Sequence, residues 1–316
     1  MNQGLALEIM LSGESVFLTG PAGSGKTYVL NQFIKLAKHS GKKVSVTATT
    51  GLAATHLGGS TIHSWAGIGV DDALPSDFLH HLSKGRREII EKTDILIIDE
   101  ISMLHDYRLD MVDEVCRLAR QKDEPFGGIQ IVMSGDFFQL PPINRGDSRA
   151  GGFVVFSKVW QELDPVVCYL DDQYRQDDET LLEVLSAIRA GDVRRHHAEM
   201  LLERVGQEHA DEFVTELHTV NIDVDSINSA RLAEIDGEQF TYEQTTTGGA
   251  SYVETLSRSV LAPAQLHLKK GALVMAVKNS LDRKYVNGSL GTVIDFDEVT
   301  HYPVVEFMNG KVLTLI

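Results

Sequence analysis

The stretch FLTGPAGSGKT, residues 17–27, decides how this chain begins to fold. An apolar run at residues 15–20, with the length of a buried strand, leads into it, and residues 26–41 follow with apolar side chains at helical spacing. The spacing of its glycines, Lys26 and Thr27 fits the pattern G-x-x-x-x-G-K-[ST]. This pattern between a strand and a helix predicts a phosphate-binding loop rather than a glycine-rich turn without a ligand.

The chemistry of this loop favours a nucleoside triphosphate. Glycines allow backbone N–H groups to turn toward phosphate oxygens, and the amino terminus of the helix adds partial positive charge. We expect Lys26 to reach the β- and γ-phosphates of ATP, and Thr27 to supply a hydroxyl ligand to Mg²⁺. The loop residues predicted to bind the nucleotide are Gly20, Ala22, Gly23, Ser24, Gly25, Lys26 and Thr27.

Two carboxylates follow another apolar run, TDILIIDE at residues 93–100. Hydrolysis of ATP requires a metal ligand and a group that orients and activates water. We predict that Asp99 holds the Mg²⁺ shell and that Glu100 activates the water. The alternative is an acidic strand end facing solvent. Because four apolar residues run directly into the acidic pair, we favour an ATPase of the kind that performs mechanical work.

Strands and helices alternate through the first half of the chain. Apolar runs at residues 42–50, 93–100 and 127–135 predict strands, and residues 107–120 predict an amphipathic helix. Continuously apolar strands that alternate with helices indicate a parallel sheet covered on both faces. The predicted fold class is therefore α/β, a P-loop NTPase domain.

The remainder of the chain suggests two further parts. A strand at residues 166–170, helices at 178–191 and 199–217, and a strand-to-helix step at 216–235 come first. Beyond residue 250, alternating strands with Asn-Gly turns at 287–288 and 309–310 favour a small β-barrel. The predicted domains are residues 1–164, with a small insertion near 66–90, residues 165–250, and residues 251–316.

Two polar residues are expected to sense the γ-phosphate. Gln139 lies in GDFFQLPPI, residues 135–143, where the prolines prevent a helix and keep the loop extended. Arg175 lies in DQYRQ, residues 172–176, and would reach across from the second domain. The alternatives are a plain proline-ended turn and a surface arginine that pairs with neighbouring aspartates.

The segment at residues 47–69, TATTGLAATHLGGSTIHSWAGIG, is rich in small residues and carries aromatic side chains. Small residues let backbone amides approach a phosphodiester chain, and an aromatic ring can stack on a base. The segment therefore suggests a nucleic-acid track. For His63 and Trp65 the competing interpretation is a structural role, and for Trp65 in particular that role is burial in the core.

Composition and net charge restrict the class of protein and the way it could bind nucleic acid. Of 316 residues, 43% are apolar and 23% charged, and the net charge is −16, which argues against binding nucleic acid through bulk electrostatics but not against a local basic track. Neither a membrane span nor a targeting signal is visible, so a cytoplasmic location is expected. The two cysteines, Cys116 and Cys168, are expected to be buried thiols.

The motifs in order resemble those of the PIF-type DNA helicases, RecD-related enzymes of superfamily 1. The matching segments are residues 20–27, 47–54, 60–65, 99–103, 135–142 and 173–176. DEISM, GDFFQLPP and TIHSW together are the most specific of them. The resemblance covers the chain from end to end and implies a RecA-like first domain, an incomplete second one and a β-rich insertion.

This resemblance implies an ATP- and Mg²⁺-dependent helicase that moves 5′→3′ along single-stranded DNA. It implies that Gln3 reads the adenine and that Tyr174 stacks near it. It places Thr50, Gly51, His63 and Trp65 along the DNA. It also places Arg283 and Lys284 at a basic tip of the β-rich insertion, for which the alternative is a solvated hairpin end. Fork or duplex junctions, a monomer, and roles in DNA repair, recombination and telomere maintenance are the corresponding expectations.

The chain also departs from the family pattern. After its β-rich insertion the family pattern returns with a segment around a His-Lys-Ser-Gln run and another around a Leu-Ser-Arg run. The sequence stops at KVLTLI before reaching either segment, so we expect a truncated chain that hydrolyses ATP poorly. A nucleotide-gated DNA-binding module without productive helicase activity is therefore the second interpretation. A small-molecule kinase is the third, but it would call for an arginine-rich lid that the sequence does not show.

Overall fold

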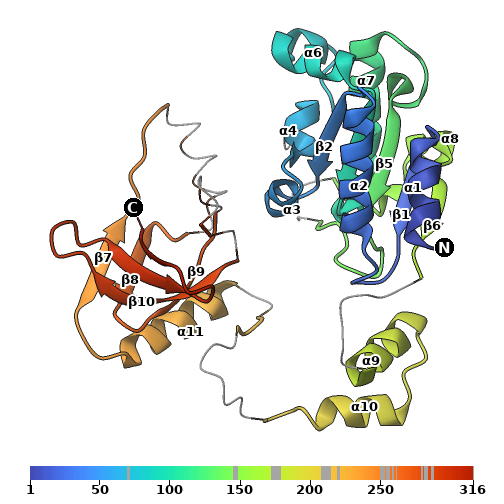
Figure 1. Ribbon diagram of the computed structural model, residues 1–316. Coiled ribbons are helices and arrows are strands. Elements are labelled where there is room, and N and C mark those ends of the chain that lie inside the picture. The colour runs from blue at the N-terminus through green and yellow to red at the C-terminus, as the bar shows by residue number, and fades with distance from the viewer. Residues whose placement is uncertain are drawn as a thin grey trace. The chain divides into compact units, whose positions relative to one another are not determined.

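The computed structural model describes residues 1–69, 72–144, 149–171, 179–207, 215–218, 221–249, 253, 257, 260, 262–278, 280, 284–285 and 288–315. The chain divides into two compact units, Met1–Val205 and Gly206–Ile316. Figure 1 shows the first unit built around a sheet with helices on its faces. No helix in the described part of the chain is both long enough and apolar enough to cross a bilayer.

The first unit contains a six-stranded sheet in the order β3-β2-β4-β5-β1-β6, in which every pairing is parallel. Its strands are β1 (Val16–Thr19), β2 (Val44–Ala48), β3 (Ser60–Thr61), β4 (Ile95–Asp99), β5 (Gln130–Ser134) and β6 (Val166–Tyr169). All residues of β1 and β4 are buried, as expected for central strands covered on both faces. The predicted parallel α/β sheet is confirmed.

Helices cover both faces because successive strand residues point to opposite sides. Val16 and Leu18 pack with α1 and α2 in one core, whereas Phe17 belongs to the other core with α4, α7 and α8. The helices of this unit are α1 (Gln3–Leu11), α2 (Lys26–His39), α3 (Gly51–His56), α4 (Ile62–Ala66), α5 (Phe78–His81), α6 (Lys84–Lys92), α7 (Asp106–Arg120), α8 (Lys158–Leu163), α9 (Glu179–Ala190) and α10 (Arg195–Leu202), with short 3₁₀ turns at Ile101–Met103, Pro125–Gly128 and Val154–Phe156. Both cysteines are buried and free, as predicted.

Strand β6 corrects the predicted start of the second domain. Residues 166–170 were assigned to the domain that begins at 165, but β6 pairs in parallel with the whole of β1, from Val16 opposite Val166 to Thr19 opposite Tyr169. The sheet of the first unit therefore extends beyond residue 164. An apolar run predicts a strand, but it does not say which sheet the strand joins.

Helix boundaries in the connecting region also differ from prediction. The helix expected at 199–217 is α10, Arg195–Leu202, and residues 203–207 and 215–218 are not helical. Residues 215–218 do not form the expected strand either, whereas the helix that follows them is present as α11, Asn221–Glu234. The predicted insertion near residues 66–90 forms α5 and α6, and Phe78, Leu82 and Ile90 bury it in the core of the first unit.

The second unit is rich in antiparallel strands. Strands β7 (Gln239–Glu243) and β8 (Gln265–Lys269) pair with each other, and a four-stranded sheet has the order β12-β11-β10-β9. Its strands are β9 (Leu273–Met275), β10 (Leu290–Phe296), β11 (Pro303–Phe307) and β12 (Val312–Thr314). Val293, Val305 and Phe307 form its core with Leu268 and Ala272. The predicted turn at 309–310 joins β11 to β12, with Gly310 at φ 78°.

Candidate nucleotide-binding site

The glycine-rich loop between β1 and α2 has a backbone that requires glycine. Gly25 has φ 87° and precedes the first residue of α2, where no side chain caps the helix. At Gly20 a Cβ atom would lie 2.6 Å from the carbonyl oxygen of Leu170, so no larger residue fits. The amides at the start of α2 therefore have no side-chain cap, as at helix amino termini that bind anions.

Lys26 closes over this loop. Its Nζ donates hydrogen bonds to the carbonyl oxygens of Gly20 at 2.8 Å and Pro21 at 3.1 Å. Burial lowers the pKa of the Lys26 ammonium, and nearby carboxylates, the strongest of them Asp136, oppose this shift. The lysine is thus held in position by the loop and surrounded by opposite charge.

Two further features of the loop, both at Ser24, are relevant to nucleotide binding. The Oγ atom of Ser24 is fully buried without a hydrogen-bond partner in the described part of the chain, which leaves a polar atom of the loop unsatisfied. Gln3, from α1, donates through Nε2 to the carbonyl oxygen of Ser24 at 3.1 Å. The predicted adenine-reading residue therefore contacts the phosphate loop directly.

The acidic pair lies at the same edge of the sheet. Parallel strands β4, β5 and β1 are neighbours, so their carboxyl ends meet there. Asp99 is 9% exposed, and burial raises its pKa. Burial and then the charge of Asp99 raise the pKa of Glu100, whose φ of 54° turns the chain out of the strand. The buried carboxylate of Asp99, the half-buried one of Glu100 and the exposed residue Thr27 fit a nucleotide with its divalent cation.

Two hydrogen bonds join the acidic pair to the predicted DNA track. Thr49 donates through Oγ1 to the carbonyl oxygen of Glu100 at 2.9 Å and through its backbone N–H to that of Asp99 at 3.2 Å. Sequence reasoning did not single out Thr49, because a threonine at a strand end has no distinctive spacing. The end of β2 and the end of β4 are thus held together.

The loop after β5 brings in a residue that the sequence did not indicate. Asp136 is 2% exposed and accepts hydrogen bonds from Gln139 Nε2 at 3.2 Å and from Arg189 Nη1 at 2.7 Å. Gln139 itself is exposed and contacts Asp136, the carboxylate with the strongest effect on the Lys26 ammonium. Arg189 belongs to α9, and nothing in the spacing of that helix predicted its role.

The predicted DNA-contacting residues fall into different environments. Thr50 caps α3, because its Oγ1 accepts from the backbone N–H of Ala53 at 3.2 Å, and Gly51 is the exposed first residue of that helix. His63 is partly buried, and burial followed by the charges of Arg108 and His105 lowers its pKa to about 4. It is therefore neutral near pH 7.

Trp65 requires a correction. It was predicted to lie along the DNA, but it is 7% exposed and packs in the core formed by β4, α4 and α7. A ring enclosed by apolar side chains has no free face on which a base can stack. Trp65 is a core residue in this structure.

Three other predicted residues, Tyr174, Arg175 and Arg283, lie outside the described residues. Lys284 is described and is exposed on the second unit.

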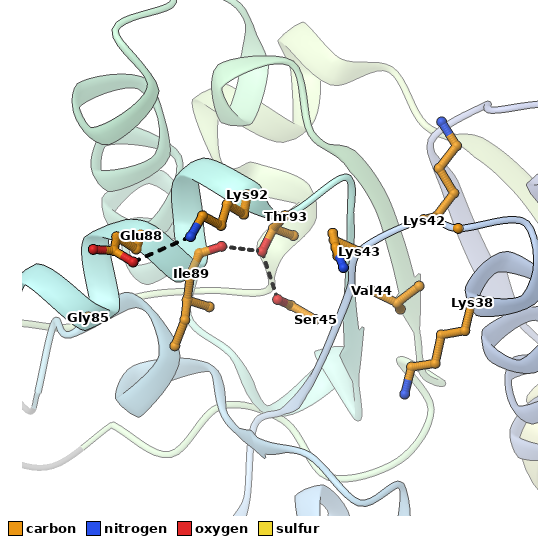
Figure 2. A pocket seen from close by; sticks show the side chains of 11 residues that line it. Lys38, Lys42, Lys43, Val44, Ser45, Gly85, Glu88, Ile89, Lys92 and Thr93 are labelled. Atoms are coloured by element: carbon orange, nitrogen blue, oxygen red, sulfur yellow. Dashed lines mark hydrogen bonds and ion pairs between the residues drawn. The ribbon is translucent and has the colours of Figure 1, made fainter.

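A hollow of about 590 Å³ lies at the opposite edge of the sheet (Figure 2). Val44 and Ser45 from the start of β2 and Thr93 before β4 line it, together with four lysines: Lys38, Lys42, Lys43 and Lys92. The Ser45 and Thr93 hydroxyls bond to each other at 2.8 Å, and Thr93 donates to the carbonyl oxygen of Ile89 at 2.7 Å. The length of the strands separates this hollow from the phosphate loop by roughly 15 Å.

A cluster of metal-ligand types on α9 and α10 is not arranged for a metal. Both His196 and His197 place Nε2 near Glu183 Oε1, at 3.2 Å and 3.3 Å. However, the backbone N–H of Arg194 donates to His197 Nδ1 at 3.0 Å. Nδ1 is therefore an acceptor and Nε2 carries the proton, so His197 donates to Glu183 rather than offering a lone pair.

The parallel sheet with a phosphate loop, an acidic pair and a polar loop at one edge defines the chain as a P-loop nucleotide-binding protein. Residues 5–199 match the family model described as PIF1-like helicase, and residues 251–296 match DNA helicase Pif1, 2B domain. The chain belongs to the PIF1-like helicase family, as the order of its motifs suggested.

Relatives extend over nearly the whole chain. ATP-dependent DNA helicase Pif1 of Psychrobacter sp. (strain PRwf-1) is 42% identical over 309 residues, which is 95% of this chain and 47% of that protein. The PIF1 helicase of Homo sapiens is 36% identical over 315 residues, 98% of this chain and 48% of that protein. The chain thus spans about half the length of these curated relatives.

Solved structures give the same picture. The Pif1 helicase from Candida albicans superposes with a TM-score of 0.84 at 34% identity, covering 97% of this chain and 75% of that one. The Bacteroides Pif1 helicase in complex with ADP-AlF3 and single-stranded DNA superposes with a TM-score of 0.72 at 30% identity, covering 98% of this chain and 72% of that one.

Proposed function

We propose that this chain is the motor portion of an ATP-dependent DNA helicase that moves 5′→3′ along single-stranded DNA. The observation that carries the proposal is the pair of hydrogen bonds from Thr49 to the backbone of Asp99 and Glu100. They tie the segment expected to follow DNA to the acidic pair expected to act on ATP. A change at either place would therefore be transmitted to the other through the joined ends of β2 and β4.

The residues at the carboxyl edge of the sheet, where the parallel strands end, have separate roles in phosphate binding, metal binding and water activation. The amides of the phosphate loop and Lys26 bind the β- and γ-phosphates, and Thr27 and Asp99 hold Mg²⁺. When bound, the ion would supply positive charge that neutralises the phosphate oxygens. Glu100 orients water and accepts its proton. Because burial raises the pKa of Glu100, this carboxylate is a stronger base than an exposed one.

Other roles are proposed by family membership and position. Gln3 contacts the adenine, with Tyr174 beside it, and Gln139 and Arg175 sense the γ-phosphate. Thr50, Gly51 and His63 follow the DNA, with Arg283 and Lys284 at a basic tip. The Bacteroides relative was solved with single-stranded DNA, and another related structure concerns unwinding at forked duplex DNA by two coordinating Pif1 helicases. Single strands and fork junctions are therefore the proposed substrates, while a monomeric state and a cytoplasmic location stay predictions.

The direct test combines turnover and binding on the same chain. Steady-state ATP hydrolysis is measured with and without oligo-dT, and anisotropy of labelled single-stranded DNA is measured at two salt concentrations with and without an ATP analogue. We expect DNA to stimulate hydrolysis and the analogue to change DNA affinity. Nucleotide-dependent DNA binding without turnover would favour the gated binding module, and hydrolysis indifferent to DNA would contradict the helicase proposal.

A further inference from the structure

The carboxylate of Asp136 organises the loop that carries Gln139. Its Oδ1 accepts from the backbone N–H of Phe138 at 3.2 Å, and its Oδ2 accepts from Gln139 Nε2 at 3.2 Å. Its backbone carbonyl accepts from the N–H of Gln139 at 2.9 Å. The position of Gln139 therefore depends on Asp136, which itself is 2% exposed.

Arg189 is the cation that compensates this buried carboxylate. Its Nη1 lies 2.7 Å from Asp136 Oδ2, and 20% of its side chain is exposed. Its guanidinium also lies 4.4 Å from the centre of the Phe138 ring, a side chain that is otherwise 70% exposed. Arg189 thus grips two residues of the loop at once, by an ion pair and by a cation–π contact.

We propose that Arg189 is a positioning residue for the nucleotide site: through Asp136 it fixes Gln139 against the γ-phosphate position. Helix α9 is thereby coupled to the state of the nucleotide. This inference rests on the proposed function, because it takes ATP as the ligand of the loop. It adds a residue from α9 that the sequence motifs do not contain.

The test compares two nucleotides on the same variants. In Arg189→Ala we expect the affinity for Mg-AMPPNP to fall about ten-fold, the size of a strong pairwise coupling, while the affinity for Mg-ADP changes less than about two-fold. The reason is that Gln139 faces the γ-phosphate, which ADP lacks. Arg189→Lys keeps the charge and should recover most of the loss. Arg195→Ala, which removes an exposed ion pair with Glu199 on α10, is the matched control and should change neither affinity.

A double variant separates positioning from general damage. If Arg189 acts through Asp136, then Arg189→Ala combined with Asp136→Asn should bind AMPPNP no more weakly than the worse of the two single variants. Hydrogen exchange of residues 135–143 should speed up in Arg189→Ala and not in Arg195→Ala. Should Arg189→Ala fail to fold by circular dichroism, Asp136→Asn, which removes the charge of the same ion pair, is compared on the two nucleotides instead.

The outcomes distinguish this inference from the proposed function. If the unmodified chain binds neither nucleotide, the proposed function fails and this inference falls with it. If the unmodified chain binds AMPPNP but Arg189→Ala binds both nucleotides normally, or loses both equally, the inference alone is overturned.

Discussion

The two edges of the parallel sheet both carry lysines, yet they differ in kind. At the carboxyl edge the single Lys26 is half-buried among the carboxylates of Asp99, Glu100 and Asp136. At the amino edge, where β2 and β4 begin, four lysines surround a hollow (Figure 2). The hydroxyl groups of Ser45 and Thr93 that line it are hydrogen-bonded to each other and to the backbone. The comparison teaches that burial and opposing charge, rather than the number of basic residues, define a site able to hold a triphosphate.

Removing one lysine from each edge of the sheet should give the largest difference between them. We expect Lys26→Ala to lower ATP turnover by at least about 10²-fold, since a donor directed at developing phosphate charge is lost. Lys42→Ala at the amino edge is the matched control and should leave turnover within about two-fold. Phosphate release in steady state is the measurement. Equal losses in the two variants would show that bulk positive charge matters more than position.

The second test removes the predicted base while keeping its shape. Glu100→Gln should lower turnover by about 10²- to 10⁴-fold, the range attributed to general acid–base catalysis, with nucleotide binding retained. Single-turnover hydrolysis and binding of a fluorescent ATP analogue measure the two effects separately. A variant that loses binding as well would assign Glu100 to the metal site instead.

How far the sequence predicted these sites depends on the range of the interactions. The phosphate loop and the acidic pair were predicted because their residues lie close together in the sequence, each directly after an apolar run that predicts a buried strand. The Arg189–Asp136 pair joins residues 53 positions apart, and no local pattern encodes such a contact. The sheet to which β6 belongs was mispredicted for the same reason.

Trp65 shows a different limit, because an aromatic residue beside polar ones is compatible with either burial or base stacking. Because Trp65 lies in the core, we expect its replacement to change the stability of the first unit more than its affinity for DNA. Trp65→Phe should lower the free energy of unfolding by about 1–3 kcal/mol, since a smaller ring leaves a cavity in the first unit. DNA affinity at a temperature where the variant is folded should stay within about two-fold. Urea unfolding and fluorescence anisotropy measure the two quantities, and a large loss of affinity with normal stability would restore the DNA-contact role.

The smallest expected effect concerns the cost of keeping Glu100 charged. Its pKa is raised in the folded state by burial and by Asp99, so the folded chain holds this proton to higher pH than the unfolded chain does. The associated stability is fully present below the ordinary pKa of a glutamate and is lost as the pH rises through the raised value. Glu100→Gln cannot ionise and escapes this loss. It should therefore be more stable than the unmodified chain near pH 7, by about 1 kcal/mol, the scale on which functional sites trade stability for activity.

This stability difference should shrink as the pH falls toward 4, where the glutamate is protonated in both states. Thermal unfolding of both chains across that range, without nucleotide or divalent cation, provides the measurement. Glu88→Gln, at the hollow of the amino edge, is the control, because Glu88 pairs with Lys92 at 3.4 Å and is 46% exposed. Its replacement should shift stability by less than about 0.5 kcal/mol. A pH-independent gain in Glu100→Gln would mean that its carboxylate is not strained by its surroundings, and the contrast between the two edges would then rest on geometry alone.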